Sequence, residues 1–249
     1  MLNEKLFVSH FVGENIPTWP CPNCGSHSLS CTKDQFQKSY KTPIDPNHPN
    51  FDPEWIEYVF SMNLKCSVAK CSSHVMCVGN GGVSQEYLHD GSGNWDWFDS
   101  FAVTFFEPPL QIFVPPKETP LDVKKSLKTS FSTFFSSPST SLTHLRSSLE
   151  VLLGEMEVPS VNGKGRFFKL EERIKLLPEE FQEIIEPANA IRWLGNDGTH
   201  AGYHVRKNDV LDGYRIFEHI LKELYPEQNA PIEELVKRIN DAKGIGKKS

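Results

Sequence analysis

Six cysteines, all between Cys21 and Cys77, are the residues whose type and spacing best suit metal binding. Cys21 and Cys24 stand in CPNCG, where proline and glycine favour a tight turn that lets two thiolates converge on one ion. The segment KCSVAKCSSHVMC offers a second pair, either Cys66 with Cys71 or Cys71 with Cys77. Two short-spaced pairs of sulfur ligands are typical of tetrahedral zinc.

This spacing predicts a structural zinc ion, and the ligands that we expect are Cys21, Cys24, Cys66 and Cys71. Cys77 lies in an alternating, strand-like stretch; it or Cys31 could replace one of the four, and His27 is a weaker candidate. Four thiolates leave no position for water, so the ion would stabilise the fold rather than do chemistry. The alternative is that these are ordinary reduced cysteines of a β-rich core.

A second set of reactive residue types lies in IRWLGNDGTH, residues 191–200. Cleavage of RNA without a metal needs a base for the 2′-hydroxyl proton, an acid for the leaving oxygen and a cation beside the phosphate. His200 can exchange protons near neutral pH, and the planar fork of Arg192 matches phosphate oxygens. Asn196 could orient the histidine or the phosphate. The candidate catalytic residues are therefore Arg192, Asn196 and His200.

These three residues would not all lie on one face of a continuous helix. On a continuous helix Arg192 and Asn196 share a face, whereas His200 lies off that face and about 12 Å from Arg192 along the axis. A bend at Gly195 or Gly198 would bring His200 back toward Arg192.

The same segment also fits a structural interpretation. Arg192 could pair with an acid such as Glu150 or Glu186 and so connect two helices. Asn196 and Gly198 could form an ordinary C-terminal helix cap.

The elements that must position these side chains differ between the two parts of the chain. After about residue 120, apolar residues repeat at helical spacing in five segments: 121–135, 137–156, 165–177, 178–194 and 208–226. Pro187 would kink or divide the fourth of them, and Arg146 and Glu150 can pair one turn apart on the second. Because no such stripe can be buried alone, we expect an antiparallel helical bundle.

Short apolar alternations, glycines and aromatic residues before residue 115 indicate strands. FAVTFFEPPLQIFVPP reads as strand, turn and second strand, and VPPKETP (residues 114–120) reads as a linker. The expected fold class is α+β, with a small β-rich zinc-ribbon domain at residues 1–115 followed by an all-α helical bundle at residues 120–249.

The net charge of −6 comes from residues in the first part of the chain. Residues 1–120 contain seven Lys, no Arg and thirteen Asp or Glu, whereas the remainder is balanced. Nucleic-acid binding normally uses a basic field and arginine forks. The charge therefore argues against a ribbon that grips DNA and favours protein contact or stabilisation. With no long apolar run and no secretory signal, we expect a cytoplasmic protein that does not span a membrane.

The motifs HLRSSLEVLL, LEERIKLLP and AIRWLGNDGTH, after a CPxCG ribbon and the segment FFEPPLQIFVPP, resemble the domain of unknown function 4145 (DUF4145) over roughly residues 120–225. That family is grouped with the HEPN superfamily of helical bundles, which often dimerise. Many HEPN members are metal-independent endoribonucleases of toxin, abortive-infection and antiviral systems. In these ribonucleases, two copies of the Arg–His motif meet at the dimer interface.

Two functions follow as expectations. The resemblance implies a bacterial antiviral or toxin ribonuclease, a homodimer in which Arg192 stabilises the phosphate of an RNA substrate and His200 is the general acid or base. The alternative is a non-catalytic interaction module, in which the helical bundle dimerises and the zinc ribbon binds a protein partner.

Overall fold

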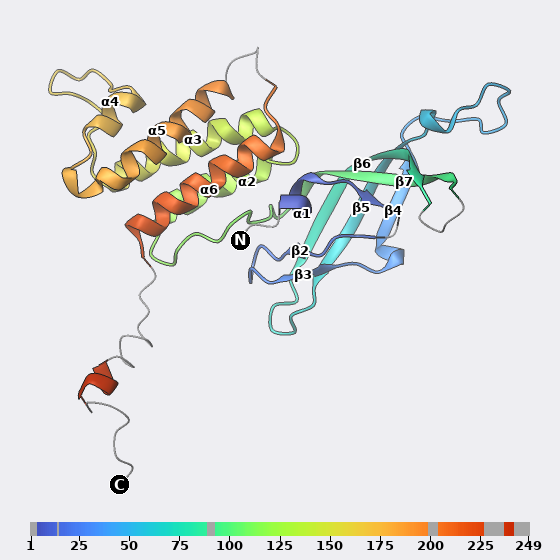
Figure 1. The fold of residues 1–249 in the computed structure, drawn as a ribbon, viewed down its shortest axis with the longest axis horizontal. Coiled ribbons are helices and arrows are strands. Elements are labelled where there is room, and N and C mark those ends of the chain that lie inside the picture. The colour runs from blue at the N-terminus through green and yellow to red at the C-terminus, as the bar shows by residue number, and fades with distance from the viewer. Residues whose placement is uncertain (1–3, 14, 89–92, 199–203, 227–236, 242–249) are drawn as a thin grey trace, which may run out of the picture.

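The computed structural model describes residues 4–13, 15–88, 93–198, 204–226 and 237–241. An antiparallel sheet formed by the first part of the chain lies beside a helical region formed by the second part (Figure 1). The fold is therefore a mixed one of strands followed by helices, as the sequence predicts. His200 lies outside the described residues.

Seven strands form one sheet that curls into a half-barrel, in the order β1-β7-β6-β5-β3-β2, with β4 paired to β5. The strands are β1 (Phe11–Val12), β2 (Trp19–Pro20), β3 (His27–Ser30), β4 (Phe36–Tyr40), β5 (Glu57–Cys66), β6 (His74–Tyr87) and β7 (Trp95–Glu107). Neighbouring strands in the described sheet all pair in antiparallel fashion. In β5, buried Tyr58, Phe60, Met62 and Leu64 alternate with outward-facing residues, which is the pattern of a sheet with one solvated face.

The inner face of the sheet is filled by aromatic rings. The ring of Phe101 lies 5.3 Å from that of Phe60 and 5.3 Å from that of Phe11, centroid to centroid. A Cβ at Gly79 would lie 2.5 Å from the Phe60 ring, and one at Gly81 would lie 2.5 Å from the Phe101 ring. Only glycine lets β6 approach these rings so closely.

The labelled α-helices are α1 (Glu4–Val8), α2 (Leu121–Thr133), α3 (Pro138–Glu155), α4 (Leu170–Lys175), α5 (Gln182–Asp197) and α6 (Lys207–Leu224), and residues 237–241 are helical as well. The helices α2, α3, α5 and α6 lie where helical periodicity predicts them. The third expected helix, at residues 165–177, is shorter in the structure, where α4 spans Leu170–Lys175. Phe167 lies outside the helix, is 76% exposed and forms a β-bridge with Val161. Pro187 lies inside α5 and does not divide it.

The expected second strand of the FAVTFFEPPLQIFVPP segment does not form. Leu110, Ile112 and Phe113 are buried without joining the sheet. The ring of Phe113 instead packs 5.4 Å from that of Phe131 on α2 and 6.1 Å from that of Tyr214 on α6. An apolar run of this length does not show from its pattern alone whether it pairs with a strand or covers helices.

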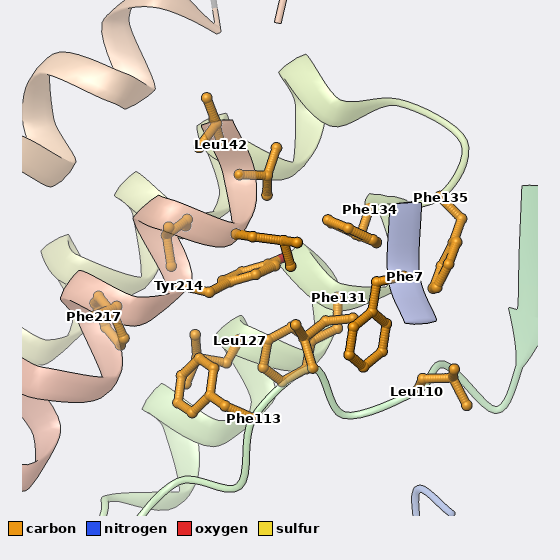
Figure 2. Close-up of a cluster of buried hydrophobic side chains, with 14 of the residues drawn as sticks. Phe7, Leu110, Phe113, Leu127, Phe131, Phe134, Phe135, Leu142, Tyr214 and Phe217 are labelled. Atoms are coloured by element: carbon orange, nitrogen blue, oxygen red, sulfur yellow. The ribbon is translucent and has the colours of Figure 1, made fainter. Parts of the chain in front are cut away.

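Sheet and helices share one hydrophobic core. Figure 2 shows its helical side, where Phe7 of α1 lies beside Phe134 and Phe135. Phe7 of α1 packs 6.4 Å from Phe134 and 6.5 Å from Phe135, and Phe106 of β7 packs 4.9 Å from Phe135. An ion pair between Arg215 of α6 and Glu4 of α1 lies at the edge of this junction. The division into domains at residues 115–120 stays a prediction.

None of the helices in the described ranges combines the length and the apolar character that crossing a bilayer requires.

Candidate functional site

Four cysteines meet where the two cysteine-bearing turns come together. Their Sγ atoms all lie within 4.8 Å of one another, and the residues are Cys21, Cys24, Cys66 and Cys71. The sulfurs of Cys21 and Cys71 are 3.7 Å apart, as are those of Cys24 and Cys66. These are the four residues expected from the sequence to act as metal ligands.

The sheet brings the two pairs together. Cys21 follows β2, which pairs with β3, and β3 pairs with β5 so that Leu29 lies opposite Cys66. Cys24 completes a tight turn in which the amide of Gly25 donates to the carbonyl of Cys21 at 2.8 Å. Gly25 has a φ of +72°, a conformation that glycine adopts without strain.

Neighbouring polar groups point at the sulfurs. The Asn23 amide donates to Cys21 Sγ at 3.4 Å, and the Asn23 side-chain amide donates to Cys71 Sγ at 3.3 Å. The hydroxyls of Ser28 and Ser73 lie 3.1 Å from Cys66 Sγ and 3.2 Å from Cys71 Sγ. Donors of this kind orient metal ligands and stabilise thiolate charge. The sequence does not predict these donors as a group, although the Asn within CPNCG is a signal for one of them.

The surroundings of the four cysteines shift the pKa values of their thiols in opposite directions. Hydrogen bonds from Ser73, and then from Asn23, lower the pKa of Cys71 to about 6. Hydrogen bonds from Ser26 lower the pKa of Cys24, whereas burial raises the pKa of Cys21 to about 11. Without an ion, one cluster therefore holds both a thiolate and a neutral thiol near neutral pH.

The donor set fits a single metal ion. Four sulfurs placed about 2.3 Å from one ion at the corners of a tetrahedron are about 3.8 Å apart. The Cys21–Cys71 and Cys24–Cys66 sulfur–sulfur distances of 3.7 Å agree with that value. The cluster could therefore hold a metal ion with little rearrangement.

The alternative ligands lie outside this cluster in the described part of the chain. Cys77 is buried on β6 opposite Met62, and burial raises the pKa of its thiol. Cys31 and His27 do not join the four sulfurs either.

Helix α5 carries the other predicted site. It runs without interruption from Gln182 to Asp197 and includes Gly195, and Gly198 keeps a right-handed conformation with φ −61° and ψ −22°. The bend considered at Gly195 is therefore absent from this described helix. Because His200 lies outside the described residues, the predicted set is placed only at Arg192 and Asn196.

Arg192 is held between two helices. Its Nη1 lies 3.6 Å from Glu171 Oε2 on α4, and its Nε donates to Asn189 Oδ1 at 3.3 Å. The guanidinium carbon lies 4.0 Å from the centre of the Trp193 ring. The side chain is only 12% exposed. The acid partner that the structure assigns is Glu171, rather than the Glu150 or Glu186 considered from the sequence.

Asn196 contacts α3 instead. Its Oδ1 accepts a hydrogen bond from Nη1 of Arg146, whose Nε lies 3.4 Å from Glu150 Oε1, the pair expected from their spacing. A Cβ at Gly195 would lie 2.5 Å from the Cβ of Arg146, and one at Gly198 would lie 2.7 Å from a carbonyl of α3. These glycines allow α3 and α5 to pack closely.

Two families match the chain. Residues 9–106, which include all four clustered cysteines, match the domain of unknown function DUF8608. Residues 128–242 match the domain of unknown function DUF4145. No curated protein and no solved structure matches the chain. The match over residues 128–242 confirms the resemblance to DUF4145 that the helical motifs predict.

Proposed function

We propose that this protein is a non-catalytic binding module, in which a metal-stabilised sheet and a DUF4145 helical region act together to hold a partner. The observation that carries the proposal is the position of Arg192. A guanidinium that is 12% exposed and bound to Glu171, Asn189 and Trp193 serves to fix α5 to α4. Asn196 is likewise bound to Arg146 of α3.

We further propose that the metal is zinc and that its role is structural. Four thiolates are the ligand set typical of closed zinc sites, and such a site has no open position for a reacting molecule. Cys21 and Cys66 are buried, which suits a site that holds turns together. The ion would join the turn after β2 to the turn after β5, a connection that the short β2–β3 pairing alone supports weakly.

A second candidate is a HEPN-like, metal-independent endoribonuclease of a bacterial toxin or antiviral system. One observation favours it, namely that Arg146 approaches Asn196 from α3 and adds a second cation to the predicted residues. In that mechanism Arg192 and Arg146 would stabilise the phosphate. His200 would transfer the proton and leave a 2′,3′-cyclic phosphate end.

Incubation of the purified full chain with end-labelled single-stranded RNA separates the two candidates. We expect no more cleavage than with a mock purification, and no change in Arg192→Ala or His200→Ala. The matched control is Lys164→Ala, an exposed residue in a loop before α4. Cleavage that persists in the control but is lost in both Arg192→Ala and His200→Ala would overturn the binding proposal in favour of the ribonuclease.

We also propose that two copies of the chain associate through the helical region. The support is Trp193 on α5, whose large apolar side chain is 58% exposed. Light scattering during size exclusion should give a dimer mass for the wild type and a monomer mass for Trp193→Ser. Trp55→Ser, at a similarly exposed position on the sheet side, serves as the control.

A further inference from the structure

A groove of about 880 Å³ lies between the cysteine cluster and the helices. One side is formed by Asn23 and Ser73, which contact the clustered sulfurs, and the other side is formed by α2. The segment that leaves β7, with Pro108 and Pro109, forms the remaining wall. The groove therefore uses both parts of the chain and is distinct from the Arg192 segment on α5.

Helix α2 gives the groove a positively charged wall. Leu121, Lys124, Lys125 and Lys128 all line the groove and follow helical spacing along one face. The opposite stripe of α2, which includes Val123 and Leu127, is buried in the core. Packing of that stripe thus points the lysine face toward the groove.

The charge of this wall is mostly uncompensated. Lys124 Nζ donates to the carbonyl of Lys117 at 2.7 Å, a neutral acceptor, whereas Lys125 pairs with Asp122 at 2.8 Å. Lys128 forms no ion pair within the described residues. None of the described residues that line the groove is acidic. In a chain of net charge −6, this is a local concentration of positive charge.

The groove also offers exposed aliphatic side chains and several prolines beside its polar residues. Val114 is 61% exposed and Leu121 is 65% exposed, so both offer aliphatic surface at the rim. Prolines from two segments line the walls and restrict backbone movement. A ligand that fits must combine apolar side chains with negative charge.

From these features we infer that the groove binds an extended acidic peptide of a partner protein, with its carboxylates on Lys124 and Lys128 and an aliphatic side chain on Val114 and Leu121. The inference rests on the proposed binding function and specifies its ligand. Charge complementarity of this kind sets specificity and speeds association.

A peptide fits this surface better than RNA does. Single-stranded nucleic acid is bound through stacked aromatic rings and often through arginine. Among the described lining residues, Phe131 is the one Phe, Tyr or Trp and is only 4% exposed, His74 is the other ring, and none is an arginine. The lysines also lie on one wall only, whereas a phosphate backbone presents negative charge along its whole length.

Selection from a random twelve-residue display library tests the inference. We expect the full chain to enrich peptides that contain several Asp or Glu residues and at least one aliphatic residue. The double variant Lys124→Glu/Lys128→Glu should bind a synthesised, fluorescently labelled winner at least about tenfold more weakly. Lys164→Glu/Lys169→Glu is the matched control, because both residues are exposed and neither lines the groove, and it should bind as the wild type does.

The outcomes separate this inference from the function on which it rests. If the enriched peptides bind the Lys124→Glu/Lys128→Glu variant with the same affinity as the wild type, the groove is not the binding site. The proposed binding function would then still stand. Failure to enrich any acidic peptide, or tighter binding of a labelled RNA of equal charge, would also overturn the groove as a peptide site. Circular dichroism of each variant shows whether the helices remain folded, so that loss of binding can be assigned to the groove.

Discussion

At the residue scale, the cysteine cluster has the clearest chemistry. The sequence predicts its four sulfurs because short spacing within each pair forces the two thiolates of that pair together. It does not predict the Ser28 and Ser73 hydroxyls beside the sulfurs, since these contacts depend on how the two turns meet.

Removal of one sulfur tests the metal. Cys66→Ser should reduce the bound metal from about one ion per chain to nearly none, because a weaker hydroxyl ligand replaces a buried thiolate. Since metal binding adds to folding free energy, the melting temperature should fall by about 10 °C. Elemental analysis and thermal unfolding measure the two effects. Cys31→Ser should change neither, and full metal retention in Cys66→Ser would contradict the ligand assignment.

The low pKa of Cys71 predicts selective alkylation. After metal removal by a chelator at pH 7, Cys71 should react with iodoacetamide before the other cysteines, because its pKa of about 6 keeps it as thiolate. Buried Cys77, whose pKa is raised, should react last. Mass spectrometry of peptides gives the order. Ser73→Ala should slow alkylation of Cys71, and an unchanged rate would show that Ser73 does not lower the pKa.

At the element scale, the periodicity of apolar residues predicts the long helices but not all of the shorter elements. It predicts α2, α3, α5 and α6, because each buries one stripe against the others. Two errors have the same origin. The apolar residues in 109–114 suggest a strand and Phe167 suggests an earlier start of a helix, but neighbouring elements decide whether such residues pair, pack or remain exposed.

The packing of α5 against α3 makes Gly195 sensitive to substitution. Gly195→Ala should lower the free energy of unfolding by about 1–3 kcal/mol, because the new methyl group would lie 2.5 Å from the Cβ of Arg146. Helix propensity alone predicts the opposite, a gain of about 1 kcal/mol. Urea denaturation distinguishes the two. Gly163→Ala, with no atom within 4 Å of the new Cβ, should have little effect, and stabilisation by Gly195→Ala would refute the close contact.

At the scale of the whole molecule, the sheet and the helices are joined by a shared core, although the sequence pattern changes at residues 115–120. Composition marks that change clearly, but it gives no sign that Phe7 reaches across to Phe134 and Phe135. Contacts between distant segments leave no local pattern in a sequence. For the same reason the groove between Asn23 and Lys128 could not be predicted.

A shared core predicts one cooperative unfolding transition. Fluorescence of Trp19, which is buried in the sheet, and helical circular dichroism should change at the same urea concentration. Phe7→Ala should lower the free energy of unfolding by about 3–5 kcal/mol and shift both signals together. Val161→Ala, at an exposed position, is the control. Separate transitions for the two signals in the wild type would show that sheet and helices fold independently.

The structural role of Arg192 carries the proposed binding function, and the stability of Arg192→Ala tests that role most directly. A side chain that joins α5 to α4 through Glu171 and packs on Trp193 should contribute about 1–2 kcal/mol to folding. Arg192→Ala should therefore lower the free energy of unfolding by that amount in urea. Unchanged or increased stability, as is common when a catalytic residue is removed, would contradict the structural role and return Arg192 to the candidate ribonuclease site.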